Sequence, residues 1–186
     1  MNEQVNPLLI IVPPQYVSAL LKLHEKLDGK NIDWAISGNL GESLRTVRVE
    51  PDCIEIVTSK KAAQQIHDAV TEFNVQTIVF LVQQLPRKAS IQAKEYPVYI
   101  RSHYFEFDID GVKVKVHGDL QYKVSDWAWG DTFQFEPDIV YIVGKKTSVV
   151  PLQVKYELYK GLGWSDRAEN ISKVFANWEK IHSRFK

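Results

Sequence analysis

Apolar positions recur along the chain at two spacings. A spacing near 3.6 residues is typical of helices with one buried face, and a spacing of two is typical of half-buried strands. The helical spacing begins after Pro13-Pro14, since proline is tolerated in the first turn of a helix. It begins again after Thr58-Ser59, which can cap a helix. The predicted helices cover about 15–27, 40–44, 60–73, 152–162 and 166–183.

Shorter apolar or β-branched runs predict the strands. Asp110-Gly111 is a hairpin signal between a loosely alternating run and a strictly alternating one. A second hairpin is predicted across Gly144-Lys145-Lys146. The predicted strands are 34–37, 53–57, 75–82, 99–107, 112–117, 139–143 and 147–150. The polar stretch 83–95 predicts a loop, and 118–138 predicts an irregular segment.

The order of these elements predicts an α/β (α+β) fold in which helices cover a central mixed sheet. A chain of 186 residues suits one domain. We expect an N-terminal arm at 1–14, a sheet-and-helix core at 15–150 and C-terminal helices at 151–186. The last helix carries an apolar stripe, which indicates core packing or, alternatively, a homodimer interface. The stripe is Ile171, Val174, Phe175, Trp178 and Ile181.

The composition of the chain argues against several classes of partner and site, namely nucleic acid, a cysteine-rich metal site and a membrane. Lys+Arg and Asp+Glu each number 23, so the net charge is zero and there is no global basic field for nucleic acid. Cys53 is the single cysteine, which excludes an internal disulfide and a Cys-rich zinc site and fits a reducing, cytoplasmic location. The apolar run 8–12 is too short to span a bilayer, so it predicts a packing arm or strand and no membrane partner.

Two strands carry candidate chemistry. The first, Trp34-Ala35-Ile36-Ser37, runs through Gly38-Asn39 into a short helix, and the second is Cys53-Ile54-Glu55-Ile56. A glycine at such a turn lets the backbone approach a phosphate, and the helix start supplies N–H donors. Carboxylates two residues apart on a strand share a face, and carboxylates are the ligands that Mg²⁺ prefers.

This arrangement resembles the minimal nucleotidyltransferases of the DNA polymerase β superfamily. Their motif is a strand ending in Gly-Gly or Gly-Ser, a short helix, and a strand with Asp-x-Asp or Asp-x-Glu. A later strand adds a third carboxylate. The hairpin from Phe107 to Leu120 and the segment from Val150 to Gly163 extend the likeness over roughly residues 15–180. The resemblance implies a nucleotidyltransferase fold, a two-metal phosphoryl-transfer site and a nucleotide-binding turn at Ser37, Gly38 and Asn39.

Carried over residue by residue, the ligand set is incomplete. The first carboxylate falls on Cys53, the second on Glu55, which is retained, and the third on Lys115. Cysteine is a poor ligand for Mg²⁺, and lysine brings a positive charge to the place of a cation. We therefore expect a degenerate site in which Lys115 substitutes for the metal and pairs with Glu55.

Reserve carboxylates remain. Asp52 points away from Glu55 in a regular strand and needs a bulge to turn inward. Asp119 follows the later strand and is another weak candidate for a metal ligand, with Glu55 and Asp52. Mg²⁺ is expected as a cofactor only if these residues supply an active site, and otherwise no cofactor is expected.

Three functions stay open at this point. The leading prediction is a nucleotidyltransferase-fold protein that is impaired in metal-dependent transfer and keeps a pocket for a nucleotide phosphate. The alternatives are an active Mg²⁺-dependent enzyme that acts on a small molecule, RNA or protein, and a non-catalytic partner-binding module. An aromatic cluster either stacks on a nucleobase, packs its loop onto the core or forms a subunit interface. Its members are Trp127, Trp129, Phe133 and Phe135.

Overall fold

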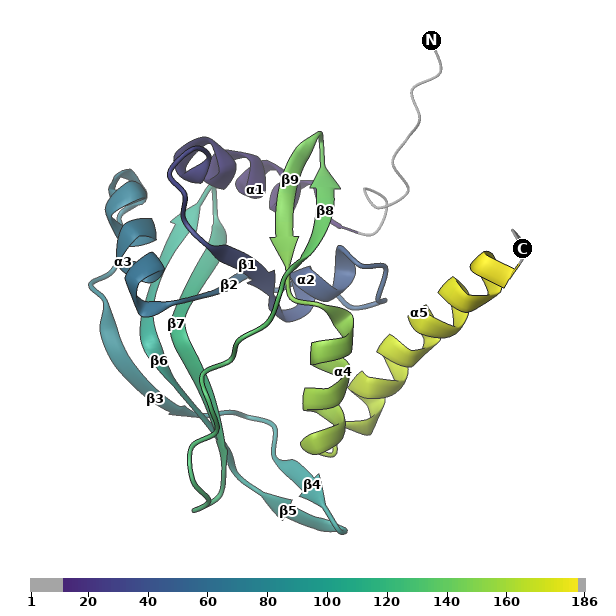
Figure 1. The fold of residues 1–186 in the computed structure, drawn as a ribbon. Helices are drawn as coiled ribbons and strands as arrows, with labels where there is room; N and C mark the ends of the chain where they lie inside the picture. Colours follow the sequence, from purple (N-terminus) through teal and green to yellow (C-terminus); the bar gives the residue numbers. More distant parts are fainter. Residues whose placement is uncertain (1–11, 184–186) are drawn as a thin grey trace.

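A seven-stranded mixed sheet organises the protein (Figure 1), which is described by a computed structural model for residues 12–183. The strand order is β3-β6-β7-β2-β1-β9-β8. β1 pairs antiparallel with β2 and parallel with β9, and β2 pairs parallel with β7. The sheet strands are β1 Trp34–Ser37, β2 Ile54–Thr58, β3 Val79–Gln84, β6 Val98–Ile109, β7 Val112–Val124, β8 Asp138–Ile142 and β9 Lys145–Val149. The predicted mixed sheet with flanking helices is confirmed.

Helices α1 (Pro14–Leu27) and α3 (Lys60–Ala69) cover one face of the sheet. α1 begins at Pro14 as predicted and buries Leu20 and Leu23 against the sheet. α3 begins after Ser59, whose Oγ accepts a hydrogen bond from the backbone N–H of Ala62 at 3.1 Å and so confirms the predicted cap. α3 ends at residue 69, and a 3₁₀ turn, Thr71–Phe73, replaces the predicted last helical turn.

Helices α4 (Leu152–Gly161) and α5 (Ser165–Ser183) lie on the other side (Figure 1). Their apolar residues form a second core with Ala89 of β4 and Val98 of β6. This core includes Ile171 and Val174 of the predicted stripe. Gly163 joins them with a φ of +67°, a conformation that favours glycine. α2 (Gly38–Ser43) follows β1 directly and starts two residues earlier than predicted, so no loop separates strand and helix.

The predicted loop 83–95 is wrong in part. It contains a two-stranded hairpin of β4 (Ala89–Ile91) and β5 (Lys94–Tyr96). The turn residues Gln92 and Ala93 both have positive φ, 50° and 61°. A two-residue turn of this kind usually carries Asn-Gly or Asp-Gly, and Gln92-Ala93 contains neither, so no local signal predicts this hairpin. β3 begins at residue 79, four residues later than predicted.

The predicted irregular segment 118–138 is also wrong in part, because β7 continues to Val124 through a bulge. The register between β6 and β7 shifts between Arg101 and His103, and Asp119 has a φ of 53°. Two residues of β7 thus oppose one residue of β6, and the alternation of faces reverses. Lys115 and His117 before the bulge face the same cavity as Leu120 and Tyr122 after it.

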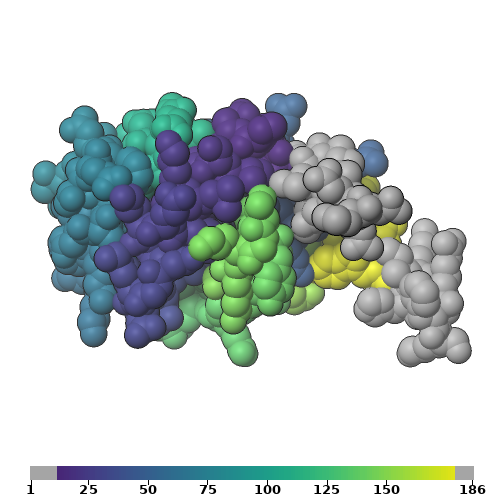
Figure 2. All heavy atoms as spheres, turned by 90° about the horizontal axis from the view of Figure 1, so that it is seen from above, coloured from purple at the N-terminus to yellow at the C-terminus, as the bar shows by residue number. Residues whose placement is uncertain are grey.

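The β8–β9 hairpin lies against the N-terminal part of the chain (Figure 2). Its Thr147 Oγ1 is 2.8 Å from Nε2 of the buried His24 on α1. The predicted arm at 8–12 lies outside the described residues except for Val12, which is buried. No helix within residues 12–183 is long and apolar enough to cross a bilayer.

Candidate active site

A cavity of about 220 Å³ lies on the sheet face opposite α1 and α3. β1 and α2 supply Gly38 and Asn39 at the strand-to-helix turn, and the start of β2 supplies Glu55. β7 supplies the floor, and α4 and α5 close the other side. The polar and charged side chains that line it are Asn39, Asp52, Cys53, Glu55, Lys115, His117, Tyr122, Lys155, Tyr159 and Arg167.

Gly38 brings the turn against a carboxylate. Its φ is +61°, and a Cβ placed there would lie 3.2 Å from Glu55 Cβ and 3.3 Å from a carboxylate oxygen of Glu55. A larger residue would therefore displace Glu55 as well as strain the backbone. The predicted meeting of glycine and carboxylate at one point of the sheet is present in the structure.

Glu55 and Lys115 are direct register partners in the parallel pair of β2 and β7. Both side chains face the same cavity. Among the described residues, however, no ion pair of 4.0 Å or less joins them. The structure places the lysine on the face of the expected third carboxylate and leaves both charged groups open to the cavity.

Asp52 also lines the cavity, although alternation in a strand would turn it away. β2 begins only at Ile54, so Asp52 precedes the regular strand and alternation does not apply to it. Its Oδ1 is 3.5 Å from Nδ2 of Asn39, which donates to the carbonyl oxygen of Glu50 at 3.1 Å. Asp52 and Glu55 are thus the carboxylates that meet here.

Cys53 lies between these carboxylates in the chain and is 7% exposed. Burial raises the pKa of its thiol to about 12, and the nearby Asp52 carboxylate adds to the effect. The free thiol therefore stays protonated at neutral pH, and cysteine is a soft ligand that suits Mg²⁺ poorly. In this uncharged form Cys53 adds no charge to the cavity.

Two predicted residues do not reach the cavity. Ser37 is 2% exposed and precedes α2 without a side-chain capping bond. Asp119 lies in the bulge itself and faces α3, where its Oδ1 accepts a hydrogen bond from the Lys60 N–H at 3.0 Å. The candidate set Glu55, Asp52 and Asp119 therefore does not converge. Across residues 12–183, no group of three or more His, Cys, Asp or Glu side chains is placed to hold a metal ion.

The sequence prediction missed two cations that α4 and α5 bring to the cavity. Lys155 is 5% exposed, and its ammonium lies 4.0 Å from the Glu42 carboxylate, with no hydrogen bond to it among the described residues. Arg167 donates to the side-chain oxygen of Asn39 at 2.7 Å and to Glu42 at 3.1 Å. Lys155 is buried on the same side of α4 as Leu152 and Tyr159, and a lysine in a buried stripe is the signal that was available.

Glu42 holds this cationic side together. It is 2% exposed and accepts hydrogen bonds from the Tyr159 hydroxyl and from Arg167. Burial and the Glu42 charge raise the pKa of Tyr159, so its hydroxyl remains a donor.

Burial lowers the pKa of His117, whose Nδ1 is 3.0 Å from Ser102 Oγ. Three cations (Lys115, Lys155 and Arg167) and two carboxylates (Asp52 and Glu55) therefore line the cavity.

Comparison with known proteins agrees with this architecture. Residues 19–172 match the family described as aminoglycoside-2''-adenylyltransferase. The chain belongs to this family. Its match to the family covers both sides of the cavity, from α1 to the middle of α5. Among curated protein sequences, none matches significantly.

One solved structure supports a nucleotidyltransferase fold for this family member. The crystal structure of a candidate nucleotidyltransferase from Thermotoga maritima superposes with a TM-score of 0.62 and 27% identity, over 89% of this chain and 96% of that one. The structure of ANT(2'')-Ia in complex with adenylyl-2''-tobramycin has a TM-score of 0.49 and 12% identity, over 92% and 99% of the two chains. The predicted nucleotidyltransferase fold is confirmed by the first likeness.

Proposed function

We propose that this member of the adenylyltransferase family binds the phosphates of a nucleotide without a divalent metal, and that its metal-dependent nucleotidyl transfer is weakened or lost. The pocket is the cavity between β2, β7 and α4. Lys115 would occupy the place of a third carboxylate and, with Lys155 and Arg167, neutralise phosphate oxygens. Backbone N–H groups at Gly38 and Asn39 would add donors.

The burial of Lys155 is the observation that carries this proposal. A buried ammonium is normally paired closely and hydrogen-bonded, because desolvating an unpaired charge is costly. The nearest carboxylate to Lys155 is 4.0 Å away and already accepts bonds from Tyr159 and Arg167, and the ammonium otherwise lies 5.5 Å from the centroid of the Tyr159 ring. A phosphate in the cavity would give Lys155 the close anionic partner that Glu42 does not fully provide.

The metal side of the site supports the same conclusion. Two-metal catalysis needs hard oxygen ligands that hold both ions in place. Asp52 and Glu55 face the cavity, but Cys53 is a neutral thiol and Lys115 is a cation. A cation at Lys115 repels a divalent ion and attracts a phosphate at the same position.

Calorimetric titration with ATP tests the proposal directly. We expect binding in buffer with a chelator, with an affinity that added Mg²⁺ does not improve. Lys115→Gln is expected to weaken binding at least about tenfold, which is the loss of one charge-assisted contact. Lys113→Gln is the matched control, because Lys113 is two residues away on β7 but bonds to Glu106 at 3.0 Å outside the cavity. Absence of ATP binding in both buffers would overturn the proposal and leave a partner-binding module.

An active Mg²⁺-dependent enzyme is the second candidate, and the position of Asp52 in the cavity favours it. That candidate predicts ATP binding only with Mg²⁺, its loss in Asp52→Asn, and transfer of labelled AMP to an acceptor. Restoring the ligand set with Cys53→Asp and Lys115→Glu gives a complementary test. If the assignment of ligand positions is correct, the double variant gains Mn²⁺ binding, measured by the loss of the free-ion EPR signal.

A further inference from the structure

A second cavity, of about 540 Å³, borders β1, β2 and α1, and it lies beside the 220 Å³ cavity proposed above to bind phosphate, which is called the phosphate cavity below. Ala35 and Val57, which are register partners on β1 and β2, face it from the sheet. Ser37 and Glu55, two residues further along, are also register partners, and Glu55 faces the phosphate cavity. Two residues of strand span about 7 Å, so the two cavities are neighbours on one pair of strands.

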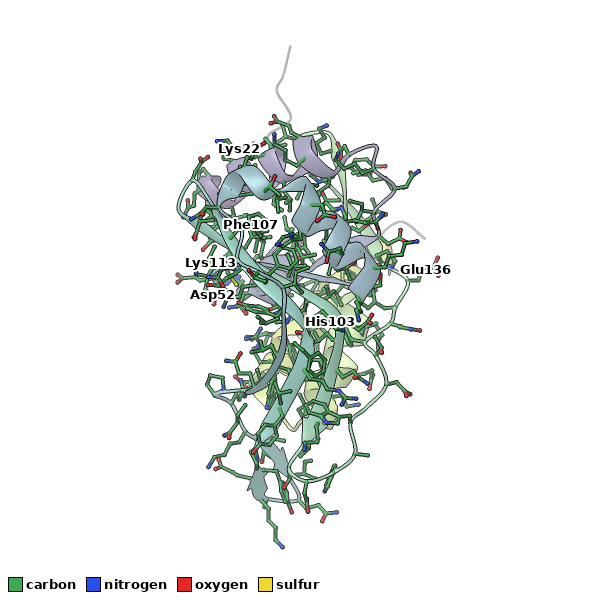
Figure 3. The ribbon with its side chains drawn as sticks, turned by 90° about the vertical axis from the view of Figure 1, so that its left-hand side faces the viewer. Lys22, Asp52, His103, Phe107, Lys113 and Glu136 are labelled. Carbon is green, nitrogen blue, oxygen red and sulfur yellow. The ribbon has the colours of Figure 1, made fainter. Side chains whose placement is uncertain are left out.

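The loop that follows β7 separates them. The N–H of Phe133 donates to the carbonyl oxygen of Leu120 at 2.7 Å, and its ring packs edge-on against Tyr122 with centroids 6.0 Å apart. Leu120 and Tyr122 line the phosphate cavity, whereas Phe133 lines the second one, and the two cavities share no lining residue. Figure 3 shows Asp52, which lines the phosphate cavity, and Glu136, the residue after Phe135 on the loop, on opposite sides of the molecule.

Aromatic side chains form the walls of the second cavity. Phe133 and Phe135 stand on the loop with ring centroids 5.2 Å apart and pack with Ala35 and Val57. Trp34, which alternates with Ala35 on β1, packs on the α1 side with its ring 5.3 Å from that of His24, and it lines the cavity from there. A volume of this size with aromatic walls is typical of sites for small planar molecules.

Some polar side chains that line the second cavity are hydrogen-bonded to other side chains, and others have no such partner among the described residues. His24 and Asp28 bond to each other at 2.8 Å, and Asp28 also accepts from Lys145 at 2.9 Å. Within the described part of the chain, the side chains of Asp33, Lys146 and Gln134 make no hydrogen bond or ion pair. The free groups thus comprise a carboxylate acceptor, an ammonium donor and an amide that can do both.

We propose that this cavity is a second binding site, which takes an uncharged planar heterocycle with both hydrogen-bond donors and acceptors, the chemistry of a nucleobase or nucleoside. Stacking against the aromatic walls holds the ring, and the free groups at the rim bind its edge. A phosphate is disfavoured here, since the carboxylates of Asp28 and Asp33 border the cavity and Lys145 is already paired with Asp28.

Calorimetry or ligand-observed NMR with adenosine, guanosine, cytidine and uridine, in buffer with a chelator, tests this site. We expect at least one nucleoside to bind with a dissociation constant on the order of 0.1–1 mM, as suits a ligand of this size in an open pocket. The corresponding monophosphate is expected to bind this site more weakly. No binding by any of the four nucleosides would overturn the inference.

Two variants locate the ring. Ser148→Trp fills the cavity from β9, and Phe135→Ala removes one wall on the loop, where loss of folding is not expected. Each is expected to weaken nucleoside binding at least about tenfold, while Lys115→Gln leaves it unchanged. Binding that survives both variants and is lost in Lys115→Gln would place the ring in the phosphate cavity and overturn the inference.

Inorganic tripolyphosphate separates this inference from the proposed function. Tripolyphosphate carries only the chemistry of the phosphate cavity, and nucleosides carry only that of the second cavity. Binding of tripolyphosphate without any nucleoside would remove the second site alone. Binding of a nucleoside without tripolyphosphate would support the second site and overturn the proposed phosphate pocket.

Discussion

The guanidinium of Arg167 donates a hydrogen bond of 2.7 Å to the side-chain oxygen of Asn39. This bond joins α5 to the turn between β1 and α2, across 128 positions of the chain. The same guanidinium contacts the buried carboxylate of Glu42. The C-terminal helices are therefore part of the site, and the cavity depends on their docking.

Arg167→Ala is expected to lower the free energy of unfolding by about 2–4 kcal/mol, because it leaves the Glu42 carboxylate buried with a single cation 4.0 Å away. Urea denaturation measures the change. Arg87→Ala is the control, since Arg87 forms an exposed ion pair with Asp166 that is worth less than about 1 kcal/mol. Equal losses in the two variants would contradict a buried network centred on Glu42.

Gly163→Ala is expected to destabilise the protein by about 2–4 kcal/mol. Gly163 has a φ of +67°, and a Cβ there would lie 1.8 Å from the carbonyl oxygen of Ser90, so β4 would have to move. Gly161→Ala is the matched control two residues earlier, where a Cβ meets nothing within 4 Å. The control is expected to be neutral or to stabilise by up to about 1 kcal/mol. Thermal unfolding of both variants decides between steric clash and a general effect of losing glycine.

Cys53 is expected to resist thiol reagents in the native protein. Burial raises its pKa from 9.0 to about 12, which reduces the thiolate fraction roughly a thousandfold at a pH below both values. The labelling rate should rise with pH up to about 12, and it should reach the rate of a free cysteine in denaturant. Rapid labelling of the folded protein at neutral pH would show that the thiol is accessible and ionised.

Asp119→Ala is expected to cost about 1 kcal/mol of stability, as the loss of a capping acceptor at the start of α3 does. Asp119→Asn should retain most of this stability, because an amide oxygen still accepts from Lys60 N–H and asparagine tolerates the positive φ. ATP affinity should stay within about twofold in both variants, since Asp119 faces α3. A large loss of ATP binding in either variant would show that Asp119 contributes to the nucleotide-binding site.

Much of the architecture could be predicted from the sequence. The prediction for β1 is right to the residue, and the hairpin at Asp110-Gly111 follows from local turn chemistry and alternation. The second hairpin is present, but its turn is Val143-Gly144 and not the predicted Gly144-Lys145-Lys146, since β9 begins at Lys145. The family resemblance then brought Gly38, Glu55 and Lys115 together, and the structure places all three at one cavity. These features are local, or they depend on the regular alternation of strands.

The remaining features depend on tertiary structure or on irregular backbone. Lys155 and Arg167 reach the cavity only because α4 and α5 dock beside it, more than a hundred positions from Asn39. Asp52 enters because β2 starts after it, and Asp119 leaves because of the bulge. A bulge inserts a single residue and has no reliable composition signal.

The bulge at Asp119 adds one residue to β7 and so changes which residues of the strand face the cavity. Before it, the odd-numbered residues of β7 face the cavity, and after it the even-numbered ones do. Deleting Asp119 would restore regular alternation, because Leu120 and Tyr122 would then follow His117 by two and four positions and keep facing the cavity. A one-residue deletion at the bulge is therefore expected to preserve the floor of the cavity, whereas a deletion between Lys115 and His117 would put these two lining residues on opposite faces of the strand.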